Sequence, residues 1–274
     1  MLQQIAYLLT VYFPLRIRDL SVNALVLLLK EEHAVELSHR LLRRKRLVGI
    51  LPDGNLLCFP LDDLKLLTII SEIYDRKIYD SEDTDNHDLI CDVGAHIGLF
   101  SLRMARKAKN GRIIAIEASP SNYRFCLRNI RLNNLNGRIE AINAAVGERK
   151  SRATLWLSNV SGGDNSLLKG WHYSAPLGRT RMRQEVSVQP LDDILPEATS
   201  RALVKIDVEG MELGVLAGLA KKSAKVSRLI IEVHTSVTEE AKVYDWLRDH
   251  DFSITRKHRL YGDCLLVEAR RHYG

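Results

Sequence analysis

The sequence has few cysteines and no long apolar run, and both absences exclude classes of protein. Its 4 cysteines form no C-x-x-C pair and have no histidine at zinc-ligand spacing, which excludes a zinc module and a disulfide scaffold. We therefore expect reduced thiols in a cytoplasmic protein. No apolar run approaches the roughly 18 residues that a membrane span needs. The apolar segment 5–15 predicts a packed amphipathic helix, with contact to a membrane surface as the alternative.

Aromatic residues and surplus charge are also scarce. Aromatic residues make up 6% of the chain, and Lys+Arg 40 against Asp+Glu 34 leaves a net charge of +6. This modest surplus, without a recognisable RNA-binding module, gives no strong signal for nucleic acid. The 274 residues suffice for one large domain or for one domain with an appendage. The sequence does not indicate an oligomeric state.

The first 84 residues predict an N-terminal extension of helices and a β-hairpin. Leucines recur there at helical spacing, and Asp53-Gly54 is a typical hairpin turn. Residues 79–88 are polar and acidic, so we place a boundary there, between units 1–84 and 85–274. The expected elements of the first unit are helices within 1–45, hairpin strands at 46–51 and 56–59, and a helix at 61–73.

From residue 85 onward, strand patterns alternate with helix patterns. This alternation predicts an α/β domain with a mostly parallel sheet and covering helices. An insert at about 153–190 interrupts it, with strands expected at 153–157 and 185–188 around a polar loop. A C-terminal hairpin requires one strand to run antiparallel to the others. The expected strands are 89–93, 112–116, 139–143, 203–207, 229–233, 252–256 and 264–269, and the expected helices are 99–108, 121–133 and 212–221.

A glycine turn follows the first strand of this domain. Asp92, Gly94 and Gly98 form a D-x-G-x-x-x-G pattern before a helix, and Glu117 follows the second strand. Glycines permit a sharp turn and the close approach of a ligand, and an acid after the second strand can bind ribose hydroxyls. A dinucleotide site expects G-x-G-x-x-G, and the Asp92 carboxylate would repel a pyrophosphate. That carboxylate suits the amino group and sulfonium of S-adenosylmethionine. The alternative is an incidental acid at a structural corner.

A second polar cluster follows two later strands. Asp207 and Glu209 end one strand, Glu232 and His234 end the next, and the carboxyl ends of parallel strands meet at one sheet edge. We predict that His234 removes a proton from the substrate, with Asp207 or Glu209 orienting it or acting instead. We predict no metal, although a metal bound by the four residues is an alternative. Another alternative is that Glu209 and Glu212 are acids at a helix N-terminus that interact with its dipole, and that His234 is a hydrogen-bonded loop residue.

The polar loop of the insert predicts a substrate pocket. It contains Asn165, Ser166 and Trp171, and we expect these side chains, together with Glu232, to contact the substrate. A loop with solvated charges is the alternative. An anionic substrate would meet three arginines in this part of the chain, Arg179, Arg181 and Arg183.

Residues from roughly 88 to 269 resemble the FkbM family of class I S-adenosylmethionine-dependent methyltransferases. The glycine turn at 92–98 and the segment KIDVEGME at 205–212 carry this resemblance. Weaker segments follow in the family's order at 143–147, 191–195 and 231–234. The resemblance implies a Rossmann-like, seven-stranded sheet with a final antiparallel strand. It also implies methyl transfer, usually to a hydroxyl oxygen.

The resemblance further implies roles for residues around the cofactor. Asp92 would orient the methionine end directly or through water, Glu117 would hold the ribose, and segment 143–145 would lie by the adenine. His96 stands where the family commonly has asparagine. The expected cofactor-binding residues are Asp92, Gly94, Ala95, His96, Gly98, Glu117, Asn143, Ala144, Ala145 and Asp207.

The leading interpretation is an O-methyltransferase whose acceptor is a hydroxyl on a saccharide, a sugar conjugate or a small metabolite. One alternative keeps the fold but methylates nucleic acid with the help of the basic surface. An NAD-dependent oxidoreductase is disfavoured by the glycine spacing and by Asp92. A non-catalytic scaffold with a vestigial pocket is disfavoured because Asp92, Glu117 and Asp207 are all present.

Overall fold

The structure is a computed structural model that describes residues 16–17, 20–21, 46–60, 63, 65–80, 86–108, 110–158, 161–169 and 182–271. Most of the predicted helical segment 1–45 lies outside the described residues. Within that segment, β1 (Arg16–Ile17) and β2 (Leu20–Ser21) pair as short antiparallel strands, so the helical prediction is wrong at these positions. In the described part of the chain, no helix is long and apolar enough to cross a membrane.

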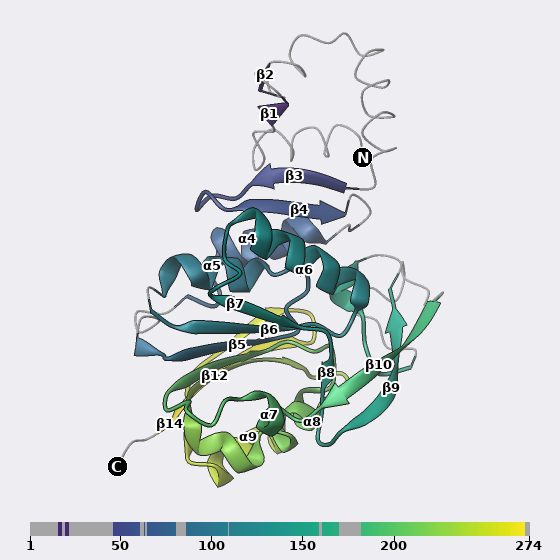
Figure 1. The fold of residues 1–274 in the computed structure, drawn as a ribbon. Coiled ribbons are helices and arrows are strands. Elements are labelled where there is room, and N and C mark those ends of the chain that lie inside the picture. The colour runs from purple at the N-terminus through teal and green to yellow at the C-terminus, as the bar shows by residue number, and fades with distance from the viewer. Residues whose placement is uncertain are drawn as a thin grey trace.

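A seven-stranded sheet forms the centre of the fold (Figure 1). In spatial order its strands are β13 (Phe252–Tyr261), β14 (Cys264–Arg271), β12 (Val226–His234), β11 (Ala202–Ile206), β5 (Leu89–Val93), β6 (Arg112–Ile116) and β7 (Ile139–Ile142). β14 runs antiparallel to both of its neighbours, and the pairs from β12 to β7 are parallel. The predicted Rossmann-like sheet with one antiparallel strand is therefore confirmed. β5, β11 and β12 are buried along their whole length, which explains their nearly continuous apolar sequences.

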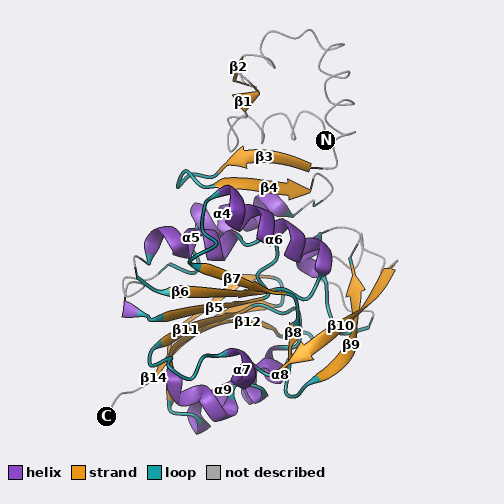
Figure 2. Cartoon of the chain, in the orientation of Figure 1, coloured by secondary structure: helices purple, strands orange, loops and turns teal. Residues whose placement is uncertain are grey.

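Helices cover both faces of this sheet (Figure 2). One layer contains α4 (Leu66–Tyr74), α5 (Leu99–Lys107) and α6 (Pro120–Leu132), and the other contains α7 (Leu191–Ile194), α8 (Glu212–Ala217) and α9 (Glu240–Asp249). Two hydrophobic clusters fill the interior, one on each side of the sheet. α6 begins where it does because the Ser119 hydroxyl accepts a hydrogen bond from the Asn122 amide and Pro120 occupies the first turn.

The predicted hairpin is present as β3 (Arg46–Ile50) and β4 (Leu56–Pro60), and it lies against α6 (Figure 1). The Asn129 side chain of α6 joins β4 like a neighbouring strand: it accepts from the Cys58 amide at 2.6 Å and donates to the Cys58 carbonyl at 3.0 Å. Hydrophobic residues on both sides of segment 79–88 share one core. The division into units 1–84 and 85–274 stays a prediction.

The insert forms a small sheet beside the main one (Figure 1). Its strand β10 (Met182–Gln189) pairs in parallel with β8 (Ala145–Val146) and antiparallel with β9 (Ser151–Leu157). Both strands that we expected in the insert are confirmed and are longer than predicted. A short 3₁₀ helix, η2 (Gly162–Asp164), follows β9. It belongs to the segment that reaches the cavity described next.

Candidate active site

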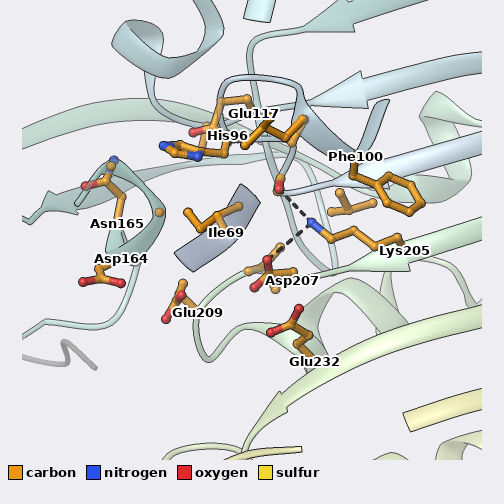
Figure 3. A pocket seen from close by; sticks show the side chains of 18 of the residues that line it. Ile69, His96, Phe100, Glu117, Asp164, Asn165, Lys205, Asp207, Glu209 and Glu232 are labelled. Atoms are coloured by element: carbon orange, nitrogen blue, oxygen red, sulfur yellow. Dashed lines mark hydrogen bonds and ion pairs between the residues drawn. The ribbon is translucent and has the colours of Figure 1, made fainter. Parts of the chain in front are cut away.

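A cavity of about 450 Å³ lies at the carboxyl ends of β5, β6, β11 and β12 (Figure 3). α4 and η2 cover it, with Ile69 projecting between its two ends and Asp164 at its side. Lys65 Nζ and Asp164 Oδ1 are 2.6 Å apart, and this ion pair joins the two covering segments. Ligands of open α/β sheets bind at this position, so the cavity is the candidate active site.

The cavity brings together most of the residues that the sequence predicts for the site. Those in its wall are Gly94, Ala95, His96, Glu117, Ala144, Ala145, Asn165, Asp207, Glu209 and Glu232. The predicted site residues that the structure describes but places outside the wall are Asp92, Gly98, Asn143, Ser166 and His234.

The glycines of the predicted turn are needed because neighbouring parts of the protein leave no space for a side chain. Gly94 has a φ of +81°, and a Cβ added to it would lie 1.8 Å from the carbonyl oxygen of Asp207. Gly98, with a φ of 91°, is the N-cap of α5. The amides of Gly94 and Ala95 both donate to the Ile116 carbonyl, at 3.0 and 2.9 Å. The turn therefore connects the ends of β5, β6 and β11, and these two amides are not available to a ligand. We expected the glycines to let a ligand approach, but the structure shows that Gly94 lets the end of β11 approach.

Glu117 follows β6, and its largely buried carboxylate faces the cavity. The carboxylate accepts hydrogen bonds from the amides of His96 and Ser119, both at 2.8 Å, and from Asn122 Nδ2 at 3.3 Å. Burial raises the pKa of Glu117, while the charge of His96 and the hydrogen bonds oppose that rise. Oε2 accepts one of the three bonds and so retains a lone pair for a ligand hydroxyl.

Asp92 does not reach the cavity. Its side chain is 0% exposed, Oδ2 accepts a hydrogen bond from the Ser101 hydroxyl at 2.7 Å, and Oδ1 lies 3.3 Å from Lys205 Nζ. Lys205 donates to the Gly94 carbonyl at 3.0 Å and faces the cavity. Burial lowers the pKa of Lys205, but the charges of Asp92 and Asp207 outweigh burial and raise it. Asp92 therefore positions the Lys205 ammonium, and a direct contact with the cofactor does not fit its position.

His96 makes a contact that the sequence does not predict. Its backbone is left-handed, with a φ of 51°, and its Nε2 lies 3.1 Å from Oδ2 of Asp63, just before α4. Burial lowers the pKa of His96, but the hydrogen bond and charge of Asp63 outweigh burial and raise it. The Asp63 carboxylate also accepts a hydrogen bond from the Gly162 amide at 3.3 Å. His96 therefore ties the glycine turn to the segments that cover the cavity.

The segment expected near the adenine is divided by the structure. Ala144 and Ala145 are buried and line the cavity. Asn143 is exposed, and its Nδ2 donates to the carbonyls of Glu117 and Ala118 at 2.8 and 3.1 Å. Asn143 thus fixes the backbone beside Glu117, and the two alanines form the wall.

Carboxylates gather at the end of the cavity that lies away from Glu117 (Figure 3). Asp207, Glu209 and Glu232 all face this end, as their positions after adjacent strands predict. Asp207 Oδ2 lies 3.4 Å from Lys205 Nζ, so a buried ammonium balances part of the negative charge.

Glu232 is a buried carboxylate with partners on both oxygens. Oε1 accepts a hydrogen bond from the Tyr79 hydroxyl, and Oε2 accepts one from the Cys264 thiol at 3.2 Å. Burial and the negative charge of Asp207 raise the pKa of Glu232 to about 7. A carboxyl group with this pKa can exchange protons near neutral pH.

The predicted base, His234, does not fit its assigned role. It is 1% exposed, with Nδ1 2.8 Å from Glu212 Oε1 and Nε2 3.5 Å from Glu209 Oε2. Burial lowers the pKa of His234, but the charge of Glu209 and the hydrogen bond with Glu212 raise it to about 10. A histidine that is already protonated at neutral pH cannot take a proton from an acceptor. His234 instead positions Glu209 and the first turn of α8.

The metal alternative concerns the same edge. Two groups of described residues have ligand atoms within 4.8 Å of one another, Asp207–Glu209–His234 and Glu232–His234–Cys264, and His234 belongs to both. Glu212 would orient the ring of His234 through Nδ1 in either group. The absence of a metal stays a prediction.

The insert contributes Asn165 to the wall of the cavity, where its Oδ1 accepts a hydrogen bond from the Ser158 amide at 2.9 Å. Ser166 lies behind the wall, and its hydroxyl donates to the Glu209 carbonyl at 2.7 Å. This bond supports the left-handed backbone of Glu209, which has a φ of 53°. Trp171, Arg179 and Arg181 lie outside the described residues.

The lead-in segment supplies wall residues that sequence analysis missed. Lys65, Glu72 and Tyr79 line the cavity, although they precede the predicted start of the catalytic unit. One signal was present for Glu72, because it stands in the apolar run of α4 beside Ile73 and three residues after Ile69. A charged side chain on the apolar face of a helix has no solvent and needs another reason to be there.

Comparison with known proteins gives one family and several relatives. The model of the methyltransferase FkbM domain matches residues 92–254. Methyltransferase 1 of Beauveria bassiana is 26% identical over 222 residues, which cover 76% of this chain and 89% of that protein. Methyltransferase sdnD of Sordaria araneosa is 28% identical over 69% of this chain and 82% of its own length. The 31-O-demethyl-FK506 methyltransferase FkbM of Streptomyces tacrolimicus is 26% identical over 61% of this chain and 73% of its own length.

Proposed function

The chain belongs to the FkbM methyltransferase family, which uses S-adenosylmethionine, and we propose that it methylates a hydroxyl oxygen of a small metabolite or saccharide. The observation that carries this proposal is a cavity with Glu117 at one end and several carboxylates at the other. A hydroxyl is a poor nucleophile until a base removes its proton, so O-methylation needs a proton acceptor beside the methyl group. The Streptomyces relative, a 31-O-demethyl-FK506 methyltransferase by name, agrees with an oxygen acceptor.

The residues of the cavity fit S-adenosylmethionine. Glu117 has a free lone pair for a ribose hydroxyl, and Ala144, Ala145 and Val146 form an apolar surface for a purine ring. The acidic end suits a positively charged sulfonium. When bound, the cofactor supplies a methyl group that is already activated. We assign the ribose to Glu117 and the adenine to the two alanines.

The remaining residues would position the acceptor and keep water out. Asp207 and Glu232 face the acceptor end and would bind its hydroxyl groups. Ile69, held over the cavity by α4, would exclude water from the reacting atoms. Asn165 and the rest of the insert would select the acceptor. Methyl transfer is an in-line displacement, so this alignment supplies much of the rate enhancement.

Methyl transfer to oxygen can be tested with the purified chain and methyl-labelled S-adenosylmethionine. The acceptors are 31-O-demethyl-FK506, methyl glycosides of glucose and rhamnose, and bulk tRNA. We expect label in a small molecule and in a form that survives mild alkali, because methyl ethers survive it and methyl esters do not. Label in tRNA alone, or in an alkali-labile product, would contradict the proposal. Glu117→Gln should abolish most of the transfer, and Glu140→Gln, at an exposed carboxylate, should not.

A further inference from the structure

Glu72 is a carboxylate of the cavity wall without a role in the chemistry described so far. It lies in α4, is 6% exposed and faces the same cavity as Asp207 and Glu232. Its Oε1 has no hydrogen-bond partner in the described part of the chain. Arg76, whose side chain is 42% exposed, pairs with it across 3.7 Å. Buried carboxylate oxygens are normally hydrogen-bonded, so an unbonded one beside a ligand cavity indicates a donor on the ligand.

Two of the other carboxylates at this end, Asp207 and Glu232, already have close partners. Asp207 pairs with the buried ammonium of Lys205. Glu232 accepts hydrogen bonds on both oxygens, from the Tyr79 hydroxyl and from a cysteine thiol. Glu209 Oε2 also lacks a hydrogen bond among the described residues, but it lies 3.5 Å from the buried ring of His234.

Within the same described part of the chain, Glu72 Oε1 has only the ion pair with the partly exposed Arg76, so Glu72 can receive a proton without giving up a hydrogen bond.

We propose that Glu72 is the general base that removes the hydroxyl proton of the methyl acceptor. This inference rests on the proposed O-methyl transfer. The acceptor oxygen forms its bond to the methyl carbon while the carbon–sulfur bond breaks, and the electron pair of that bond stays on sulfur. The proton of the hydroxyl goes to Glu72. The products are a methyl ether, a neutral thioether and a carboxylic acid, so atoms and charge balance without another reactant.

The electrostatic surroundings of Glu72 suit a base that acts near neutral pH. Burial, the charge of Glu232 and the charge of Asp207 raise the pKa of Glu72 to about 7, and Arg76 and Lys65 oppose that rise. A bound sulfonium adds positive charge to this end, so we expect cofactor binding to lower the pKa of Glu72 and release a proton. The titratable groups that face Glu72 from other elements are Asp207, Glu232, Tyr79 and Tyr261.

A carboxylate at this position has one competing role, which is to hold the amino group of the cofactor. S-adenosylhomocysteine separates the two roles because it keeps the amino group and lacks the sulfonium and the methyl group. If Glu72 faces the acceptor, Glu72→Gln leaves the affinity for S-adenosylhomocysteine within about twofold. The matched control is Asp75→Asn, which changes an exposed carboxylate at the C-terminal end of the same helix.

The test counts protons by calorimetry at pH 7 in phosphate and in Tris buffer. The wild type, Glu72→Gln and Asp75→Asn are each titrated with S-adenosylmethionine and with S-adenosylhomocysteine. With S-adenosylmethionine, we expect the wild type and Asp75→Asn to release about half a proton more than Glu72→Gln, because a carboxyl group near its pKa is about half ionised beforehand. With any acceptor methylated in the transfer assay, Glu72→Gln should lower kcat about 10²–10⁴-fold and leave KM for the cofactor unchanged.

Equal proton counts in the wild type and Glu72→Gln would overturn the inference and leave the methyltransferase function intact. A loss of S-adenosylhomocysteine affinity of about tenfold or more in Glu72→Gln would also overturn it, because Glu72 would then hold the cofactor. Failure of all three proteins to bind S-adenosylmethionine would contradict the proposed function and this inference with it.

Discussion

The two ends of the cavity differ in how they hold their carboxylates. At the end that we propose for the cofactor, called the cofactor end below, Glu117 accepts two backbone hydrogen bonds and one side-chain hydrogen bond. At the acceptor end, Glu72 has an oxygen without a hydrogen bond, and burial and neighbouring charges raise the pKa of Glu72 and of Glu232 to about 7. The first arrangement is a prepared binding site. The arrangement at the acceptor end lowers the stability of the fold and leaves carboxyl groups that can exchange protons near neutral pH. Both features are typical of catalytic sites.

Gly94 packs directly against the backbone of Asp207, so changing it should give the largest effect. In Gly94→Ala the new Cβ would overlap the Asp207 carbonyl, and the left-handed backbone alone costs about 1–3 kcal/mol for a non-glycine residue. We expect the free energy of unfolding to fall by roughly 4 kcal/mol or more, as measured by urea denaturation. Gly54→Ala is the matched control because Gly54 has a φ of +84° and open space around it. It should cost about 1 kcal/mol, and an equal loss in both variants would refute the close contact.

His234 supports the acceptor end, and its replacement should destabilise the fold next most strongly. His234→Gln removes a buried cation from between Glu209 and Glu212, so we expect a loss of roughly 3 kcal/mol at pH 7. The folded-state pKa of about 10 lies above the ordinary 6.5, so this stabilisation is present below pH 6.5 and is lost as the pH rises through 10.

Thermal melts across this pH range would check the role of His234. The wild type should lose stability from pH 6.5 to 10, and His234→Gln should lack that loss. A variant that keeps wild-type stability and fails only in turnover would restore His234 as the predicted base.

Glu117→Gln tests whether the cofactor end is a binding site. The amide cannot reproduce the charged acceptor, so we expect the affinity for S-adenosylhomocysteine to fall about tenfold, or ~1.4 kcal/mol. Calorimetry with Glu140→Gln as the exposed control would measure this change. If Glu117→Gln binds as tightly as the wild type, Glu117 does not hold the ribose.

Glu72→Gln should have the smallest effect on stability and the opposite sign. The folded-state pKa of about 7 lies above the ordinary 4.5, so the wild type loses stability as the pH rises from 4.5 through 7. Removing the carboxylate should therefore stabilise the protein at pH 8, by about 1–3 kcal/mol, relative to its effect at pH 4. Urea denaturation at the two pH values, with Asp75→Asn as the control, would show this difference. If Glu72→Gln is destabilised equally at both pH values, ionised Glu72 does not destabilise the fold, and the two ends of the cavity do not differ as described.

The positions of the residues proposed for the cofactor end could be predicted from the sequence because their signals are local. Gly94, Gly98 and Glu117 follow two consecutive strands, and strand ends and glycine turns are encoded within a few residues. Even there, Asp92 was assigned to the cofactor because a sequence shows where a side chain occurs and not which way it points. Its contacts with Ser101 and Lys205 depend on packing between strand and helix.

The acceptor end could be predicted only in part. The strand pattern brings Asp207 and Glu232 to one edge, as the structure shows. It does not reveal that Glu212 of α8 reaches His234, which changes the histidine from a base into a fixed cation. Glu72 lies in α4, far earlier in the chain, and its place in the cavity wall depends on how α4 packs over the sheet.

The central claim is that the cavity binds S-adenosylmethionine, and direct titration of the wild-type chain tests it most simply. Calorimetry should be performed with S-adenosylmethionine, S-adenosylhomocysteine and NAD under identical conditions. The account predicts saturable binding of the first two ligands at one site and no binding of NAD. Binding of NAD, with no affinity for the other two, would contradict it.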